Sequence, residues 1–299
     1  MAFVVTGAAG FIGSHLVEAL AAAGHEVIGI DRRAGVPAAA RHEIVADLVS
    51  DAPDVTAALA GADAVLHLAG CPGVRITGPD VEALRLRDNV VAGARVLAAV
   101  PNSVRVVVVS SSSVYGGALH DGVLRPSREG DSLRPTGGYA RSKVALEDLA
   151  LRRAAAGGAV TIVRPFTVAG ERQRPDMALA RWILAASEGT PLTILGSPGR
   201  MRDVTDVADV IAGLIGIVER DVGGTFNLGS GHPRSLTEMA TAVCDVLGVE
   251  CRFNVEPAGS EEVAATWASI DRARSLLDYE PSTDLSGIVR RQVTALQPA

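Results

Sequence analysis

A tyrosine and a lysine four residues apart are the pair in this sequence best suited to proton transfer. Tyr139 and Lys143 lie in the stretch GGYARSKVAL, and Lys143 is the only lysine among 28 basic residues. Arginine and lysine are not interchangeable where a compact, mobile charge is needed. On a helix, this spacing puts both side chains on one face. An ammonium about 4 Å from a phenol would lower the phenol pKa from about 10 to about 7, so we expect Tyr139 to be a general acid–base group tuned by Lys143.

A glycine-rich loop near the N-terminus is the second chemical feature. The stretch TGAAGFIGSHL contains three glycines, Gly7, Gly10 and Gly13. Their spacing permits a tight turn and close approach of a pyrophosphate to the N–H groups at a helix N-terminus. The next strand ends in Asp31, whose carboxylate can accept hydrogen bonds from both hydroxyls of an adenosine ribose. The pattern predicts NAD as the cofactor, because Asp31 would repel the 2′-phosphate of NADP; Arg32 and Arg33 keep NADP as the alternative. Lys143 could also hold the nicotinamide ribose.

Other polar residues follow predicted strands. Ser110–Ser113 come directly after the apolar run VRVVVV, so they would lie at the carboxyl edge of a sheet, where ligands of such folds bind. Asp47 follows the third strand and could reach the adenine edge. A helix cap or an ordinary loop carboxylate is the alternative interpretation of Asp47.

The elements that must position these residues alternate regularly. Short β-branched runs alternate with Ala/Leu segments of helical periodicity over about the first 165 residues. Runs that are apolar on both faces suit a parallel sheet covered by helices on each side. We therefore predict an α/β fold with a Rossmann-type doubly wound parallel sheet and a smaller C-terminal α/β substrate domain. The expected NAD-binding domain is 1–165, with 204–230 returning to it, and the expected substrate-binding domain is 166–203 with 231–299; the family resemblance described below implies that its substrate is a nucleotide sugar.

Composition argues against several classes of protein. The net charge is -6 with basic residues scattered, which offers no footprint for nucleic acid or an acidic membrane. The three cysteines are odd in number and lack CxxC spacing, so neither a disulfide framework nor a zinc site is indicated. The N-terminus has no basic leader, and no apolar run approaches the roughly 20 residues of a membrane span. We expect a cytoplasmic protein without a bound metal.

The motifs together resemble a known family. TGxxGxxG, Tyr-x-x-x-Lys, HLAG at His67–Gly70 and SSSSVYG resemble the extended short-chain dehydrogenase/reductase family, in particular its nucleotide-sugar epimerases and dehydratases. The resemblance runs from about residue 3 to 295. It implies Ser111, Tyr139 and Lys143 as catalytic residues, with Ser111 bonded to the sugar 4-hydroxyl. It also implies a homodimer formed by the helix around residues 85–99 and the helix bearing Lys143.

The same resemblance implies a set of cofactor-binding residues. Asn89 matches the Asn-Val-x-Gly helix of the family, a structural and proton-relay position; a residue at a helix kink is the alternative. The implied set is Gly7, Gly10, Phe11, Ile12, Gly13, Asp31, Arg32, Asp47, Leu48, Leu68, Ala69, Gly70, Asn89, Tyr139, Lys143 and Pro165.

The residues that distinguish the reactions of this family favour epimerisation. Related dehydratases carry a sequence similar to Thr-Asp-Glu-Val-Tyr after the fifth strand. Here Ser112 and Ser113 stand at the positions of its Asp and Glu. Related UDP-glucuronate decarboxylases usually carry the same Glu, again replaced by Ser113. The stretches 163–183 and 67–75 are similar to those of UDP-glucuronate 4-epimerases. The resemblance thus implies NAD-dependent 4-epimerisation of a UDP-sugar, with UDP-glucuronate to UDP-galacturonate favoured. The alternatives are a UDP-glucose or UDP-N-acetylglucosamine 4-epimerase, a UDP-glucuronate decarboxylase, or a non-enzymatic NAD-binding scaffold.

The substrate-binding residues also follow from the resemblance. Thr167 and the serines could surround a sugar carboxylate with neutral hydroxyl donors, and Arg174 could lock its loop; a solvated loop arginine is the alternative. Arg202 would meet the pyrophosphate, and Glu262 stands at an acid position that grips uridine, although the companion arginine position is Gly259. The full set is Ser111, Ser112, Ser113, Tyr139, Thr167, Arg174, Met177, Arg202 and Glu262.

Overall fold

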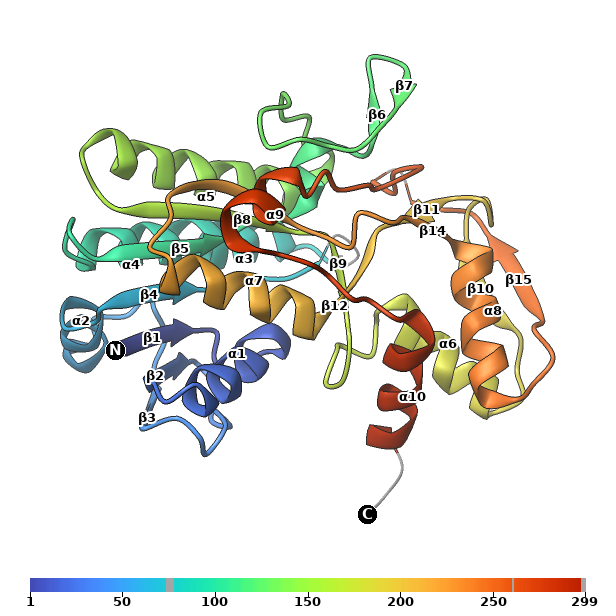
Figure 1. The fold of residues 1–299 in the computed structure, drawn as a ribbon, viewed down its shortest axis with the longest axis horizontal. Helices are drawn as coiled ribbons and strands as arrows, with labels where there is room; N and C mark the ends of the chain where they lie inside the picture. Colours follow the sequence, from blue (N-terminus) through green and yellow to red (C-terminus); the bar gives the residue numbers. More distant parts are fainter. Residues whose placement is uncertain (74–77, 260, 297–299) are drawn as a thin grey trace.

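A parallel sheet of seven strands forms the centre of this computed structural model, which describes residues 1–73, 78–259 and 261–296 (Figure 1). The strand order is β13-β8-β5-β4-β1-β2-β3. The order reverses beside β1, which pairs with both β2 and β4. The sheet confirms the predicted doubly wound fold, and ligands of such folds bind at this switch point. The strands are β1 (Ala2–Thr6), β2 (Glu26–Asp31), β3 (His42–Val45), β4 (Ala64–His67), β5 (Arg105–Val109), β8 (Val160–Pro165) and β13 (Gly224–Leu228).

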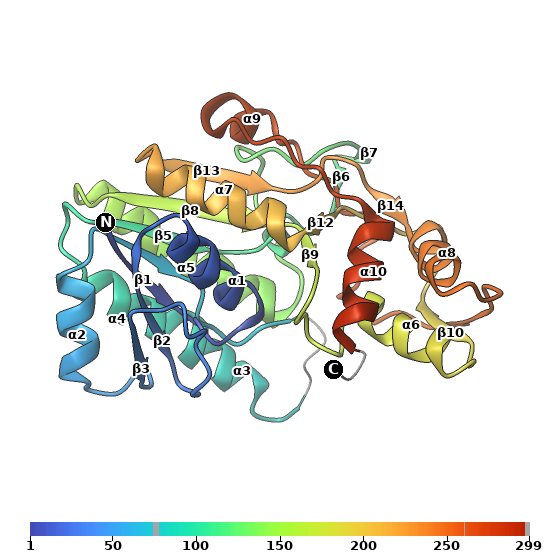
Figure 2. The same cartoon turned by 60° about the horizontal axis from the view of Figure 1, so that its bottom comes forward.

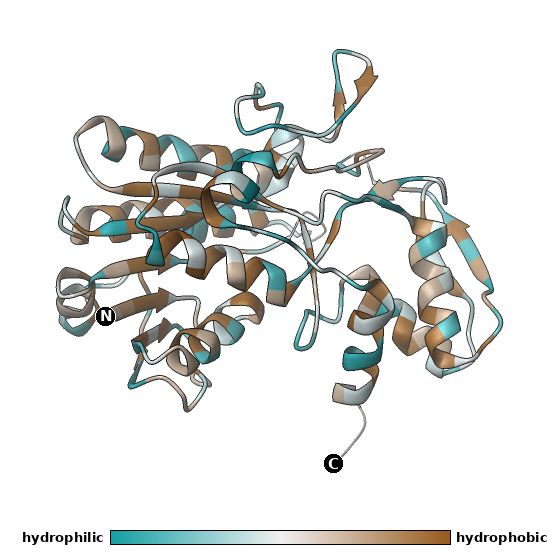
Figure 3. Cartoon of the chain, viewed as in Figure 1, coloured by the Kyte–Doolittle hydropathy of each residue, from teal (hydrophilic) through white to brown (hydrophobic). Residues whose placement is uncertain are grey.

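Helices cover both faces of the sheet. On one face, Phe3 and Val5 of β1 pack in a cluster that includes Leu16 of α1 (Phe11–Ala22) and Val210 of α7 (Val207–Glu219). On the other face, Val4 packs with residues of α2 (Pro53–Ala60), α4 (Ala92–Ala99) and α5 (Gly137–Ala155). Successive side chains of a strand point to opposite faces, so a strand between two helical layers must be apolar throughout. The central strands are accordingly hydrophobic along most of their length (Figure 3).

A smaller group of elements lies beyond the carboxyl ends of the strands (Figures 1 and 2). It contains α6 (Ala178–Ser187), α8 (Leu236–Leu247) and α10 (Leu285–Leu296), together with β10 (Leu192–Leu195) paired in parallel with β15 (Phe253–Glu256). These elements share a separate apolar cluster that includes Trp182, Met239 and Ile288. The exact division of the chain into two domains stays a prediction.

Short elements connect these two parts. The pairs β9 (Thr167–Ala169) with β12 (Val204–Asp206) and β11 (Met201–Arg202) with β14 (Arg234–Ser235) join segments that are distant in sequence. The remaining elements are the hairpin β6 (Leu119–His120) and β7 (Val123–Leu124), the 3₁₀ turn η2 (Ser112–Tyr115) and α9 (Asp271–Leu277). Strands of two or three residues carry too little periodicity for a sequence-based prediction.

The helix predicted around Asn89 has a different form. It consists of α3 (Val81–Arg85), the π-helical turn η1 (Leu86–Val91) and α4, so the extra residue of a π-helix interrupts the expected α-helical periodicity. Within the described helices, none is long and apolar enough to cross a membrane.

Candidate active site

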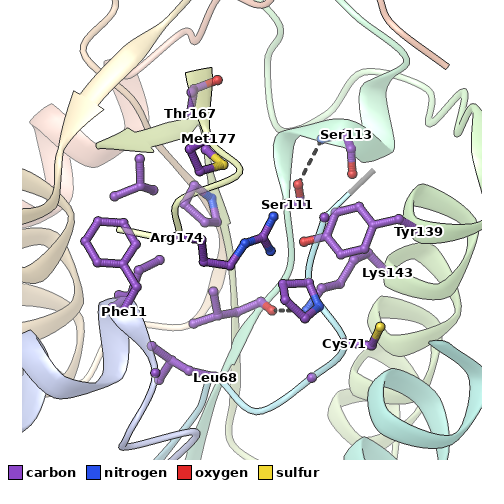
Figure 4. Close-up of a pocket in the computed structure, with 18 of the residues that line it drawn as sticks. Phe11, Leu68, Cys71, Ser111, Ser113, Tyr139, Lys143, Thr167, Arg174 and Met177 are labelled. Carbon is purple, nitrogen blue, oxygen red and sulfur yellow. Dashed lines mark hydrogen bonds between the residues drawn. The ribbon is translucent and has the colours of Figure 1, made fainter. Parts of the chain in front are cut away.

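A cleft of about 710 Å³ opens at the carboxyl ends of β1, β4, β5 and β8 (Figure 4). It extends between the sheet edge and the C-terminal helices, because Leu179 of α6 and Met239 of α8 also line it. Of the residues predicted for the site, Asn89 alone does not line the cleft. Those that do are Gly7, Gly10, Phe11, Ile12, Gly13, Asp31, Arg32, Asp47, Leu48, Leu68, Ala69, Gly70, Ser111, Ser112, Ser113, Tyr139, Lys143, Pro165, Thr167, Arg174, Met177, Arg202 and Glu262.

The predicted acid–base pair lies on one face of α5. Lys143 is 6% exposed, and its Nζ atom lies 6.0 Å from the centroid of the Tyr139 ring. The same Nζ donates a hydrogen bond to the carbonyl oxygen of Val109 at 3.0 Å, which ties it to the end of β5. Figure 4 shows the Ser111 side chain and the guanidinium of Arg174 directed toward the Tyr139 ring. The i, i+4 spacing therefore places these groups in one part of the cleft.

The pKa values of the pair correct one expectation. Burial raises the pKa of Tyr139, and hydrogen bonding with Ser111 and the charge of Arg174 only partly oppose this effect. Burial also lowers the pKa of Lys143 to about 8, although Glu147 acts in the opposite direction. The predicted fall of the Tyr139 pKa to about 7 is wrong for this structure, because burial disfavours both charged forms and the ammonium loses its proton first.

The glycine loop forms a cradle that fits a dinucleotide. Gly7 has φ 72°, and a Cβ atom there would lie 2.7 Å from the backbone nitrogen of Ala69. A Cβ atom on Gly13 would lie 2.1 Å from the carbonyl oxygen of Gly7, so the start of α1 packs tightly against the loop. Gly10 is the N-cap of α1 and gives it no side-chain hydrogen bond, which leaves this helix N-terminus suited to a pyrophosphate.

The acidic residues beyond the loop are held in place by backbone N–H groups. Asp31 accepts hydrogen bonds from the nitrogen atoms of Ala9 at 3.1 Å and Arg33 at 3.0 Å. Asp47 accepts one from Val49 at 3.0 Å and pairs with Arg87. Burial acts to raise the pKa of Asp47, but these two partners outweigh it and the pKa is lowered. Both carboxylates are thus fixed at the end of the cleft where an adenosine would lie.

Asn89 contributes indirectly to the site. It is fully buried in η1, where its Oδ1 accepts a hydrogen bond from the Cys71 nitrogen at 2.8 Å. Its Nδ2 donates to Ser142 Oγ at 2.8 Å, and Ser142 Oγ in turn donates to the carbonyl oxygen of Tyr139 at 2.8 Å. Asn89 therefore connects the loop after β4 to the helix that carries the acid–base pair.

The predicted substrate residues occupy the other end of the cleft. Arg174 forms two hydrogen bonds with Asp176, at 2.8 and 2.6 Å, so its guanidinium is held within its own loop. Ser113 Oγ is buried without a hydrogen-bond partner in the described part of the chain, which suits a donor to a ligand. Arg202 pairs with Glu262 at 2.8 Å. The Arg202–Glu262 pair joins two distant segments, and the segments around residues 113, 174, 202 and 262 all line the same cleft.

Several cleft residues were not predicted from the sequence. Cys71, Gln173 and Glu261 each border a predicted residue or motif, so their adjacency was an available signal. The Nε2 atom of Gln173 is buried and has no hydrogen-bond partner among the described residues. Val263 borders Glu262 and had the same signal, whereas Thr266 borders no predicted site residue and reaches the cleft through tertiary contacts. Two residues of the motif at 67–75, numbers 74 and 75, lie outside the described residues.

Comparisons with known proteins agree with this geometry. An uncharacterized UDP-glucose epimerase of Bacillus subtilis, YtcB, is 33% identical over 99% of this chain and 98% of its own length. A UDP-glucuronic acid 4-epimerase from Bacillus cereus, solved in complex with UDP-glucuronic acid and NAD, is 29% identical with a TM-score of 0.90, covering 99% of this chain and 98% of that chain. MoeE5 in complex with UDP-glucose and NAD is 38% identical with a TM-score of 0.88 over the same shares of the two chains.

A family model provides the assignment. The model described as the NAD dependent epimerase/dehydratase family matches residues 3–229. The match covers the glycine cradle, the serine run, and the tyrosine and lysine of α5, and it confirms the resemblance inferred from these motifs. The chain belongs to the NAD-dependent epimerase/dehydratase family of enzymes, and its cofactor is NAD.

Proposed function

We propose that this enzyme is a 4-epimerase of UDP-sugars that interconverts UDP-glucuronate and UDP-galacturonate. The observation that carries the proposal is the chemistry around Tyr139: hydroxyl groups and one arginine line the cleft where related dehydratases and decarboxylases carry acids. Ser112 and Ser113 stand at those acid positions, at the start of η2. The similarity to the Bacillus cereus UDP-glucuronic acid 4-epimerase supports this substrate.

Tyr139 and its neighbours would carry the proton transfer. Tyr139 takes the proton of the sugar 4-hydroxyl, and Ser111 hydrogen-bonds the same oxygen. NAD, when bound, would supply the hydride acceptor for carbon 4 and then the hydride donor for the other face of the 4-keto sugar. Tyr139 gives the proton back to the oxygen in that second transfer. Because burial raises the pKa of Tyr139, the phenolate must be stabilised by Ser111 and Arg174, which both act to lower that pKa, together with the Lys143 charge. Lys143, beside the Val109 carbonyl, would also hold the nicotinamide ribose.

The hydroxyl-rich end of the cleft would hold the sugar carboxylate. A 4-keto uronic acid is a β-keto acid, and it loses carbon dioxide when its carboxylate turns perpendicular to the ketone plane. Thr167, Ser112 and Ser113 offer neutral hydrogen-bond donors that can fix the carboxylate orientation. Arg174, which Asp176 holds with its guanidinium directed toward Tyr139, would restrain the sugar from that side (Figure 4). This restraint would favour return of the hydride over decarboxylation.

A product analysis tests the proposal. The protein is incubated with UDP-glucuronate and, separately, with UDP-glucose, and the products are identified by NMR. Formation of UDP-galacturonate is the expected result. UDP-xylose as the main product would overturn the epimerase assignment. Turnover of UDP-glucose with none of UDP-glucuronate would favour the second candidate, a UDP-glucose 4-epimerase, which the similarity to the Bacillus subtilis protein supports.

We also propose that the enzyme is a homodimer. Aliphatic side chains are exposed along α3, η1 and α5, where Leu84 is 43%, Val91 42% and Leu151 54% exposed. Apolar side chains on neighbouring helices suit burial against a second copy. The expected molar mass by light scattering is twice that of one chain, and a mass near 30.7 kDa would contradict the proposal.

A further inference from the structure

Six charged side chains pair with one another at the adenosine end of the cleft. They come from the end of β2, the end of β3 and the π-helical turn η1: Asp31, Arg32, Arg33, Asp47, Arg87 and Asp88. Three arginines and three aspartates cancel in formal charge. An arriving nucleotide therefore meets arginines that already have carboxylate partners.

Asp88 is the centre of this group. Its Oδ2 accepts a hydrogen bond from Arg32 Nη1 at 2.9 Å, and its Oδ1 accepts one from Arg87 Nη1 at 2.6 Å. Arg87 is held a second time by Asp47. Both oxygens of Asp88 are thus engaged by guanidinium groups from two separate segments. Its side chain is 10% exposed, so breaking these pairs would leave a buried carboxylate without its partners, which is costly.

Arg32 is the arginine whose position matters for the cofactor. It directly follows Asp31, and both residues line the cleft. In nucleotide-binding sheets of this type, an acid here bonds the ribose 2′-hydroxyl of NAD, whereas a nearby arginine accommodates the 2′-phosphate of NADP. The Arg32 side chain is 53% exposed, so its guanidinium could reach an incoming phosphate if Asp88 did not hold it.

We propose that Asp88 is a cofactor-specificity residue, which selects NAD by holding Arg32 away from the ribose 2′ position. Asp31 repels a 2′-phosphate directly, while Asp88 removes the cation that would attract it. Arg33 would attract a 2′-phosphate less effectively than a released Arg32, since its side chain is 70% exposed and its Nε lies 3.8 Å from Asp31. Selection against NADP then rests on two acids that are 57 positions apart in the sequence. The proposal does not depend on which sugar the enzyme uses.

A binding competition tests this role without measuring activity. Full-length protein is dialysed to equilibrium against equal concentrations of NAD and NADP, and the bound nucleotides are released and quantified by chromatography. Asp88→Asn should raise the bound ratio of NADP to NAD by at least about tenfold, the effect of one charge-assisted hydrogen bond. Asp88→Ser, which keeps an acceptor for Arg87, should shift the ratio in the same direction and serves if the first variant does not fold.

Two further variants separate release of Arg32 from a general change of charge. Asp51→Asn makes the same change in net charge at an ion pair with Arg95, where Asp51 is 98% exposed, and should leave the ratio unchanged. Adding Arg32→Ala to Asp88→Asn should abolish the gain. An unchanged ratio in both folded Asp88 variants would overturn the proposal. Persistence of the gain without Arg32 would overturn it as well.

Discussion

Replacing Lys143 gives the most direct test of the acid–base site. Its ammonium lies 6.0 Å from the centroid of the Tyr139 ring. With the centroid distance taken for the phenolate charge, an effective dielectric constant of about 20 gives about 2.8 kcal/mol of stabilisation, or about two pKa units. Losing this charge from the transition state corresponds to about a hundredfold in rate. Lys143→Met should therefore lower turnover by about a hundredfold at pH 7.

Lys143→Arg separates charge from shape. The guanidinium is larger and planar, whereas the ammonium lies 3.0 Å from the Val109 carbonyl oxygen and close to Gly70. Arginine keeps the charge but cannot place it in the same position. We expect turnover to fall at least about a hundredfold in this variant too, the usual scale for an acid–base contribution.

The pH dependence of turnover gives a second test of the Lys143 charge. Because the pKa of Lys143 is lowered to about 8, the ammonium is present below that pH and is lost as the pH rises through it. Wild-type turnover should fall above about pH 8, and the difference from Lys143→Met should narrow there. Residual activity of Lys143→Arg should lack this fall, since guanidinium stays charged. Turnover is followed by NMR with the identified substrate, and retained NAD and thermal unfolding serve as controls. Near-full activity of Lys143→Arg with an unchanged pH profile would refute the reasoning.

Four other changes test separate features. Glu147→Gln breaks a buried pair with Arg164 at 3.0 and 2.7 Å, and should lower the free energy of unfolding by about 3–5 kcal/mol in chemical denaturation. Arg174→Ala should lower turnover about tenfold or more and yield UDP-xylose as a side product by NMR; a product mixture like the wild type's would contradict its restraining role. Leu151→Glu should halve the mass found by light scattering. Burial lowers the pKa of His67 to about 3 in the folded state, so the unfolded state binds one more proton between about pH 3 and pH 6.5. The stability that comes from the neutral His67 is therefore complete above about pH 6.5 and is lost as the pH falls toward 3. His67→Gln should remove a slope of up to about 1.4 kcal/mol per pH unit from denaturation midpoints compared across that range.

The central sheet and the proximity of Tyr139 and Lys143 could be predicted because local patterns determine them. Alternate residues of β1 enter the two apolar clusters on opposite faces of the sheet, and a run such as VRVVVV has no other stable position. The spacing of Tyr139 and Lys143 needs only a helix to bring them to one face. The connections β9–β12 and β11–β14 could not be predicted in this way, because each depends on pairing between distant segments.

The pKa values show a limit of another kind. Spacing indicates which groups are neighbours, but burial determines which form of each group is favoured. The sequence gives no measure of the burial that shifts the pKa values of Tyr139 and Lys143, so the expected stabilisation of the phenolate was too large. The Val109 carbonyl oxygen holds Nζ at the end of β5, and the sequence does not indicate this contact either.

The π-helical turn η1 carries two adjacent polar residues, Asp88 and Asn89, that serve different parts of the cleft. Both side chains are buried, and neighbouring residues of a helix project in different directions, so each has its own partners. In the structure, Asn89 bonds to Cys71 and to Ser142 below Tyr139, while Asp88 turns to Arg32 at the rim of the cleft. One short turn therefore supports the acid–base helix and, next to it, the charge pairing at the adenosine site. Such turns are frequent at functional sites because the additional residue redirects the side chains around it. A change at either position should thus affect its own end of the cofactor site first.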